Sequence, residues 1–238
     1  MKRQSSGFVI GIIVSIVLGF GIVAGIVLAL RSSTALGYEP QVLQAQKTGP
    51  GTATLNLSTF PDSHVCHASE GEPQINWVTY CSSTDASQGT TWEVPPNTLV
   101  TVIINQYDSA SGLVNDYFSQ VRGTVGGVAM YNGRPMTKIN PDDAAHTFTL
   151  QTTPDSANPL FVSVPLLGVP DNAPNVDVNG QSYPKPNVIS FQFRTGAADT
   201  YVWHCYVPCG SDRGIPYGFS GPMSTTGYMA GTVTVANY

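Results

Sequence analysis

The sequence predicts an all-β domain, a sandwich or Greek-key barrel, that follows one apolar N-terminal segment. Short alternating runs of residues recur from about residue 51 onward, and Gly, Pro, Asn and Asp separate them. No segment after residue 31 has a long helical period. Charged residues make up 11% of the chain and hydrophobic residues 42%, which is typical of a packed exported domain and unlike a disordered chain. Strands at this density in one domain imply two packed sheets or a barrel.

The N-terminal segment is predicted to be a membrane anchor. Residues 8–30 contain no charge, and as a helix they would be about 34 Å long, enough to cross a bilayer. Lys2 and Arg3 precede the segment, so we expect the N-terminus in the cytoplasm and the rest outside. The alternative is a cleaved signal peptide, whose apolar region normally has about 7–15 residues. We therefore expect a single-pass protein of the cell membrane, with its anchor in residues 1–31.

The remainder is predicted to be a linker, residues 32–50, and one extracytoplasmic domain, residues 51–238. All fifteen acidic residues follow Arg31, which indicates a mildly acidic exported surface. Nothing is basic enough to suggest a nucleic-acid partner. The chain also has no nucleophile elbow, no HExxH motif and no paired-carboxylate motif, so a hydrolase has no support.

Seven runs are expected to form the main strands of the domain, because each alternates or is rich in β-branched and aromatic residues. Two or three short turns of helix are expected near residues 108–119. Three long insertions between strands, residues 61–90, 107–145 and 166–187, are candidate binding surfaces. The predicted strands are residues 52–59, 98–106, 146–152, 161–165, 188–194, 200–206 and 231–237.

The four cysteines all follow the N-terminal segment. Cys66 and Cys81 lie in one insertion, and an exported compartment permits disulfides, so we expect these two to pair. A bridge across this loop would stabilise the fold by roughly 3 kcal/mol. The alternative is a metal cluster formed by His64, Cys66 and His67.

A family resemblance follows from three further stretches. A strand that begins HTFTL, a later strand that ends in Cys205 and the C-terminal run GYMAGTVTV together resemble the cupredoxin family over residues 85–238. The resemblance implies a copper site in which His146 supplies an imidazole, Cys205 a thiolate and Met229 an axial thioether. Soft sulfur ligands combined with imidazole suit copper.

The spacing Cys205-x-x-x-Cys209-Gly also resembles the periplasmic domain of cytochrome c oxidase subunit II. That family has a membrane anchor before a cupredoxin domain and uses two bridging cysteines in a dinuclear copper centre. This chain departs from the pattern, because no histidine follows His204 and the expected position holds Arg213. A dinuclear centre would lack one imidazole.

Three interpretations of the two-cysteine motif remain open. A mononuclear copper ion could be held by His146, Cys205, Cys209 and either Met229 or Met223. Alternatively, Cys205 and Cys209 could form a disulfide in a metal-free domain, if the loop turns sharply at Pro208 and Gly210. In the third interpretation, copper uses a further ligand, such as His204 or His67.

Neighbours of the motif are expected to serve packing. His204 is adjacent to Cys205 on a strand, so its side chain should point to the opposite face. Trp203 and Tyr228 are expected to fill the core or cover the site. Met223 and Met229 could also fill irregular gaps rather than bind metal.

These observations favour a membrane-anchored subunit or accessory of a respiratory electron-transfer complex. It would carry electrons through copper or keep the fold without the metal, and it would be at most an electron-transfer or non-catalytic subunit. Its expected partners are the membrane and other subunits, with no small-molecule substrate. The alternative is a non-redox docking module that disulfides stabilise.

Overall fold

The computed structural model describes residues 15, 19, 21–26, 42–61, 66, 80–85, 89–208 and 229–238. The chain divides into two compact units, residues 1–39 and residues 40–238. The second unit begins within the stretch that the sequence assigns to a linker, because residues 42–49 form two short strands. These strands have no alternating pattern by which the sequence could identify them.

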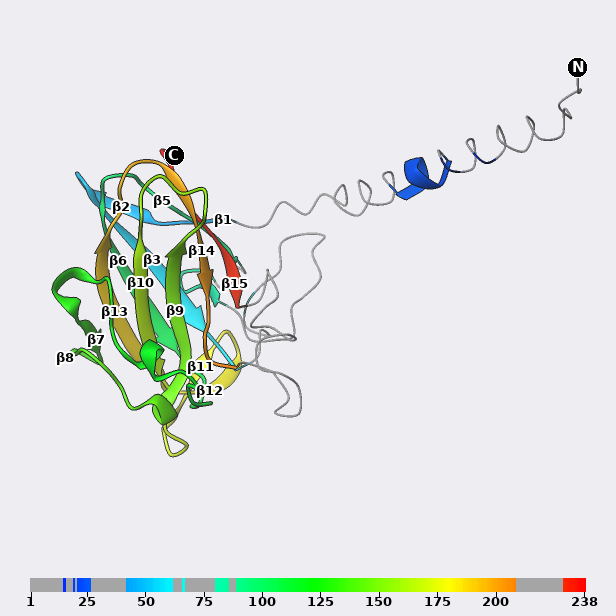
Figure 1. Cartoon of the computed structure of the whole chain (residues 1–238). Coiled ribbons are helices and arrows are strands. Elements are labelled where there is room, and N and C mark those ends of the chain that lie inside the picture. The colour runs from blue at the N-terminus through cyan, green and yellow to red at the C-terminus, as the bar shows by residue number, and fades with distance from the viewer. Residues whose placement is uncertain are drawn as a thin grey trace, which may run out of the picture. The chain divides into compact units, whose positions relative to one another are not determined.

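The second unit contains two large β-sheets and one small hairpin (Figure 1). The hairpin is formed by β11 (Asn175–Val178) and β12 (Gln181–Pro184). The six-stranded sheet has the order β1 (Val42–Gln44), β5 (Thr91–Val94), β15 (Ala230–Val235), β14 (Asp199–His204), β9 (Ala144–Thr152) and β10 (Phe161–Leu167). The seven-stranded sheet has the order β2 (Gln46–Gly49), β3 (Thr52–Thr59), β6 (Leu99–Gln106), β13 (Asn187–Arg194), β7 (Ala129–Tyr131) and β8 (Arg134–Met136), with β4 (Tyr80–Ser82) paired to β3.

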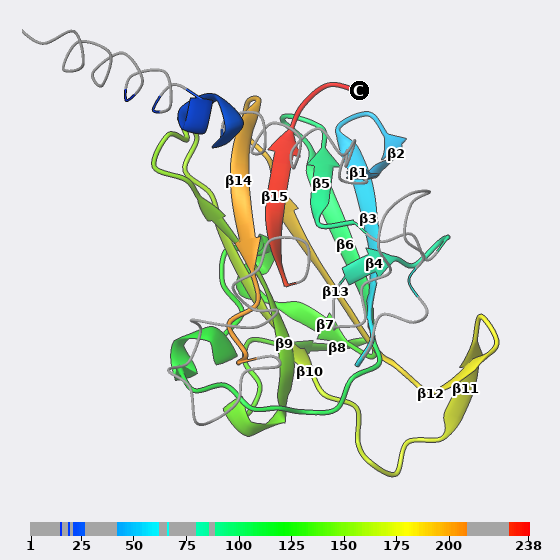
Figure 2. The ribbon, with the colours of Figure 1, turned by 90° about the vertical axis from the view of Figure 1, so that its right-hand side faces the viewer.

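The strand order requires the chain to cross between the sheets repeatedly. β1 lies in the six-stranded sheet and β2, which follows it, lies in the other. β5 is parallel to both of its neighbours, β1 and β15, whereas β14 is antiparallel to both β15 and β9. β9 and β14 therefore lie side by side, as Figure 2 shows, although some 50 residues separate them in sequence.

Alternating burial along the strands explains how the core forms. In β6 every second side chain is buried, beginning with Val100, and β13 shows the same alternation. The six-stranded sheet contributes large aromatic rings to the same hydrophobic cluster. Trp92 stacks on Trp203 with ring centroids 4.4 Å apart and on Phe148 at 5.3 Å. Trp203 also donates its indole N–H to the carbonyl of Thr90, so it serves packing, as expected.

All seven predicted strands are present, with boundaries that differ by at most two residues at either end. Of the two or three short turns of helix predicted near residues 108–119, the structure has one, the 3₁₀ helix η1 (Asp116–Ser119), which the Asn115 side chain caps. Two further 3₁₀ helices, η2 (Val125–Gly127) and η3 (Pro141–Asp143), lie in the same insertion. The prediction that the domain is all-β is therefore confirmed.

The predicted transmembrane helix and single-pass membrane localisation are contradicted. Within the part of the chain that the structure describes, no helix is both long and apolar enough to cross a bilayer. Of the predicted anchor, only Ser15, Gly19 and residues 21–26 belong to the described part.

Candidate functional site

The structure places His146 beside Cys205. His146 lies on β9, and Cys205 directly follows the last residue of β14, which pairs with β9. The Nδ1 atom of His146 is 3.9 Å from the Cys205 sulfur. Both side chains are buried, each with 1% of its surface exposed. Strand pairing therefore brings together two candidate ligands that are far apart in sequence.

The alternation of β14 continues past its end and decides which side chains face the core. Tyr201, Trp203 and Cys205 are buried, whereas His204 and Tyr206 are only half-buried. His204 thus belongs to the opposite face from Cys205, as the sequence predicts. Burial lowers the pKa of His204, while the charge of Cys205 opposes that shift.

The sulfur of Cys205 has polar neighbours in an otherwise apolar environment. The backbone N–H of Thr147 points at the sulfur across 3.4 Å, and the Val207 carbonyl lies 3.7 Å from it. An N–H group directed at sulfur stabilises the thiolate form, which is the form that binds metals. The N–H of Thr147, the strand neighbour of His146, therefore favours negative charge on the Cys205 sulfur.

Met229 is the third candidate ligand of the site. It directly precedes β15, its side chain is fully buried, and it belongs to the same hydrophobic cluster as Cys205. Its backbone carbonyl accepts a hydrogen bond of 2.9 Å from the backbone N–H of Cys205. The two residues are thus fixed next to each other through their backbones.

His146 is held from its other side by Asp108. The Nε2 atom of His146 lies 3.1 Å from the Oδ2 atom of Asp108, whose side chain is 17% exposed. Burial lowers the pKa of His146, but the hydrogen bonds and charges of Asp108 and Cys205 raise it more strongly, so the pKa increases from 6.5 to about 9. The sequence gives no signal for Asp108, because it lies in a long insertion and belongs to no recognised motif.

The donor set fits copper in its chemistry and its spacing. With the bond lengths that zinc makes, about 2.0–2.1 Å to imidazole nitrogen and about 2.3 Å to thiolate sulfur, two donor atoms of one tetrahedral or trigonal ion would lie about 3.6–3.8 Å apart. The observed separation of 3.9 Å is close to this span. Imidazole, thiolate and thioether together are the ligands that copper favours.

The described residues do not form a complete metal site from His, Cys, Asp and Glu side chains alone. Across those residues, no group of three or more His, Cys, Asp and Glu side chains is arranged to hold a metal ion. Cys209 and Met223 lie outside the described residues, and so do His64 and His67. The proposed roles of these residues, including a Cys205–Cys209 disulfide, stay predictions.

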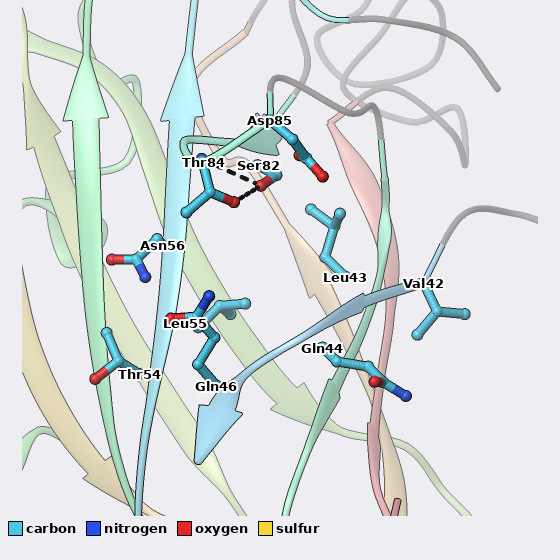
Figure 3. A pocket seen from close by; sticks show the side chains of 10 residues that line it. All are labelled: Val42, Leu43, Gln44, Gln46, Thr54, Leu55, Asn56, Ser82, Thr84 and Asp85. Carbon is cyan, nitrogen blue, oxygen red and sulfur yellow. Dashed lines mark hydrogen bonds between the residues drawn. The ribbon is translucent and has the colours of Figure 1, made fainter. Parts of the chain in front are cut away.

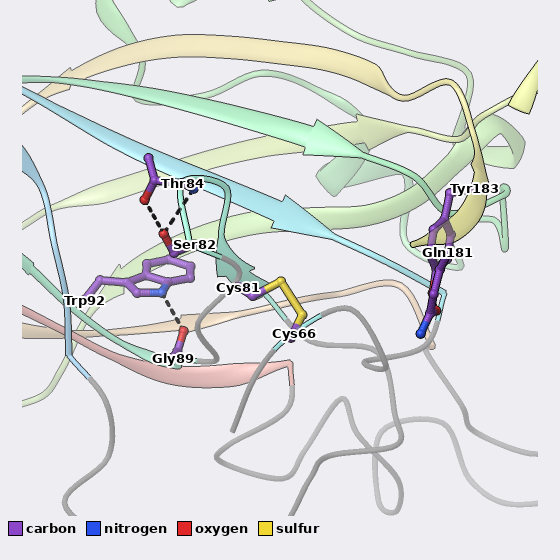
Figure 4. The surroundings of a disulfide bond; sticks show 8 residues. All are labelled: Cys66, Cys81, Ser82, Thr84, Gly89, Trp92, Gln181 and Tyr183. Atoms are coloured by element: carbon purple, nitrogen blue, oxygen red, sulfur yellow. Dashed lines mark hydrogen bonds between the residues drawn. A yellow bond between two sulfur atoms is a disulfide. The ribbon is translucent and has the colours of Figure 1, made fainter. Parts of the chain in front are cut away.

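The predicted Cys66–Cys81 disulfide is confirmed (Figure 4). The two Cα atoms are 5.8 Å apart, which is within the normal range. Because the sulfur of Cys66 is used in this bond, it is not a thiolate ligand for a cluster with His64 and His67. The bridge joins the insertion at Cys66 to β4.

A separate polar pocket lies between β1 and β3 (Figure 3). It has a volume of about 240 Å³, and its lining includes Gln44, Asn56 and Asp85. A second pocket of about 250 Å³ shares Asp85 and extends to Tyr107. Neither is lined by His, Cys or Met, so neither offers the soft ligands of a copper site.

Comparisons with known proteins give a likeness in structure only. No family model matches the sequence, and no curated protein matches it. The solved structures that match include several of rusticyanin and one of auracyanin B. A reduced rusticyanin is 13% identical, with 87% of this chain and 95% of that chain covered and a TM-score of 0.35.

Two further structures resemble the chain to a similar degree. Rusticyanin from Thiobacillus ferrooxidans is 14% identical, with 81% of this chain and 86% of that chain covered and a TM-score of 0.35. Auracyanin B is 16% identical, with 81% and 94% covered and a TM-score of 0.30. One rusticyanin structure is described as that of a copper protein. Because the TM-scores are below 0.5, the functional proposal rests on the geometry around His146 and Cys205.

Proposed function

We propose that the protein is a cupredoxin-like electron carrier with one copper ion held by His146, Cys205 and Met229. The observation that carries the proposal is the buried pair of His146 Nδ1 and Cys205 Sγ, 3.9 Å apart. The bound copper would supply a one-electron redox couple.

The residues of the chain provide the environment for that couple. The Thr147 N–H stabilises negative charge on Cys205, and Asp108 lies at hydrogen-bond distance from the His146 ring. The surrounding core excludes water, since Trp203, Met229 and Val207 are fully buried. A rigid and dry site lets the ligands keep their positions when the charge of the site changes.

The partner in this proposal is another redox protein, which gives or accepts single electrons. The spacing of Cys205 and Cys209, similar to that in oxidase subunit II, supports a place in a respiratory chain. The fifteen acidic residues all follow Arg31 and outnumber the basic residues there, which would favour a basic partner surface. An increase in electron-exchange rate at low ionic strength would support that choice of partner.

Copper titration of the purified protein tests the proposal. We expect one copper ion per chain and a thiolate-to-copper charge-transfer band in the visible spectrum. Cys205→Ser and His146→Ala should abolish the band. His204→Ala should keep it, because His204 belongs to the other face of the strand. Absence of copper binding by the wild-type protein, after reduction of its thiols, would reject the proposal.

A second candidate is a metal-free structural module. It is favoured by the position of Cys205 within the main hydrophobic cluster and by the established Cys66–Cys81 disulfide. In that case the protein would bind no copper, and thiol counting under denaturing conditions would find Cys205 and Cys209 oxidised. One experiment therefore separates the two functions.

A further inference from the structure

The carboxylate of Asp108 occupies the position directly behind the His146 ring. Its Oδ2 atom is 3.1 Å from Nε2 of His146, and Nδ1 of the same ring faces the Cys205 sulfur at 3.9 Å. The three side chains form a row of carboxylate, imidazole and sulfur. Asp108 follows the end of β6 in the seven-stranded sheet, whereas His146 and Cys205 belong to the six-stranded sheet.

The chemistry of a carboxylate fixes the direction of the hydrogen bond. An ionised aspartate only accepts hydrogen bonds, so Nε2 of His146 must carry the proton that is shared with Asp108. The remaining nitrogen, Nδ1, faces Cys205. When a metal takes the place of any proton on Nδ1, the lone pair of this nitrogen is available to it. Ligating histidines in proteins commonly donate their second N–H to a carboxylate in this way.

Asp108 is itself held by several hydrogen bonds. The backbone N–H of Ser109 donates to its Oδ1 atom at 2.7 Å. The fully buried side chain of Gln106 bonds to the backbone of Asp108 twice, accepting from its N–H and donating to its carbonyl, both at 2.8 Å. Val169 N–H donates to the same carbonyl at 2.9 Å. Asp108 is therefore held by two neighbours in its own segment and by Val169 from a distant segment of the chain.

We propose that Asp108 is a positioning residue of the copper site, which fixes the ring and the tautomer of His146 so that Nδ1 is presented beside Cys205. The inference rests on the proposed function. Asp108 does not touch the metal and acts only through His146. Its negative charge also increases electron density on the imidazole, which favours oxidised over reduced copper and lowers the reduction potential.

The first test uses metal-free protein, so that it does not depend on copper. In ¹⁵N-histidine-labelled protein, we expect a slowly exchanging Nε2–H signal from His146. Asp108→Leu should remove its protection from exchange, and Asp108→Asn should keep part of it, because the amide oxygen can still accept. An unchanged His146 signal in Asp108→Leu overturns the inference. If Asp108→Leu does not fold, the His146 signal is measured in Asp108→Asn instead. A signal as well protected from exchange as in the wild type would then overturn the inference.

The second test adds copper ions to the same proteins. We expect Asp108→Leu to bind copper about 10–100-fold more weakly than the wild type and Asp108→Asn to lose less. The midpoint potential of Asp108→Asn should be higher than that of the wild type. Asp155→Asn, which removes the same charge from an exposed turn, should match the wild type in both measurements.

The outcomes separate this inference from the proposed function. Copper affinity and potential unchanged in Asp108→Asn and Asp108→Leu would overturn the positioning role while the electron-carrier function stands. A wild-type protein that binds no copper would remove the function. The His146 signal would then still decide whether Asp108 positions the ring.

Discussion

Asp199 shows how single side chains fix the junctions between strands. It begins β14, and its Oδ2 atom accepts the backbone N–H of Asn158, while Oδ1 accepts that of Thr200, both at 2.8 Å. The Tyr201 hydroxyl also donates to the Asn158 carbonyl. The hydrogen bonds from the backbone of Asn158 and Thr200 lower the pKa of Asp199.

This lowered pKa predicts a pH-dependent contribution to stability. A carboxylate with a lower pKa in the folded state stabilises the fold above its unfolded pKa, and the contribution is lost as the pH falls through the folded value. Asp199→Asn should lower the melting temperature at pH 7, and the difference from the wild type should shrink below about pH 4. Thermal melts at several pH values would measure it. A difference that stays constant down to pH 2 would contradict the assignment.

Thr147 carries a second prediction at this scale. Its hydroxyl accepts the backbone N–H of Tyr206 at 2.8 Å and a hydrogen bond from Thr149 at 3.2 Å, and both threonines are fully buried. Thr147→Val should reduce the free energy of unfolding by about 1–3 kcal/mol, because the Tyr206 N–H loses its buried partner. Denaturant unfolding measures the loss. Thr54→Val, at a half-buried position of β3, should change stability by less than about 0.5 kcal/mol.

In β15 the backbone of Gly231 lies very close to the ring of Trp203. Gly231 pairs with Trp203 across the strands, and a Cβ atom at this position would meet the Thr90 carbonyl oxygen and the indole nitrogen of Trp203. The missing side chain thus leaves room for the hydrogen bond from Trp203 to Thr90.

Gly231→Ala should therefore destabilise the protein by about 1–3 kcal/mol through overpacking. The fluorescence of the buried tryptophans, followed during denaturation, would report both the loss and any change around Trp203. Gly196→Ala is the matched control, because its Cβ atom would make only ordinary contacts with Asn158 at 3.5 Å and beyond. Equal effects of the two substitutions would rule out a steric cause.

The strands also show which elements the sequence could predict. β6 and β13 alternate clearly between buried and less buried positions, and the sequence identifies both. β1, β4 and β7 have only three residues each, too few to show a period. For the candidate site, the residues of the cupredoxin-like motif indicate His146, Cys205 and Met229. Asp108 is found only in the folded structure, because the strand pairing and the end of β6 bring it to His146.

At the scale of the whole molecule, the Cys66–Cys81 disulfide is a covalent link within the described residues. Cys66 and Cys81 belong to a small hydrophobic cluster with Phe60, Tyr107 and Tyr183. Phe60 and Tyr107 stack with ring centroids 4.5 Å apart. The bridge therefore supports a cluster that is separate from the main core.

Removing the bridge should lower the stability of the whole domain. We expect the double variant Cys66→Ser/Cys81→Ser to lose about 3 kcal/mol of unfolding free energy, because the unfolded chain gains conformational freedom. Guanidinium unfolding measures the loss. The wild-type protein with this bond reduced should have nearly the same free energy of unfolding as the variant. A variant as stable as the oxidised wild type would refute the expectation.

The division of the chain at residue 40 gives a further prediction. Residues 40–238 form a compact unit with their own core, so a chain that begins at Pro40 should fold independently. Its melting temperature and its copper titration should equal those of the full chain. Circular dichroism and the same metal titration would check this, and loss of cooperative unfolding would contradict it.

The parallel arrangement of β1, β5 and β15 has a mechanical consequence. Val42 and Thr232 both lie level with Thr91, so β1 and β15 run in the same direction on either side of β5. Tension applied between residue 42 and the C-terminus would act along the strands, and several backbone hydrogen bonds would have to break at once. We therefore expect the domain to resist stretching from these two ends more strongly than a pair of strands that can be peeled apart one bond at a time.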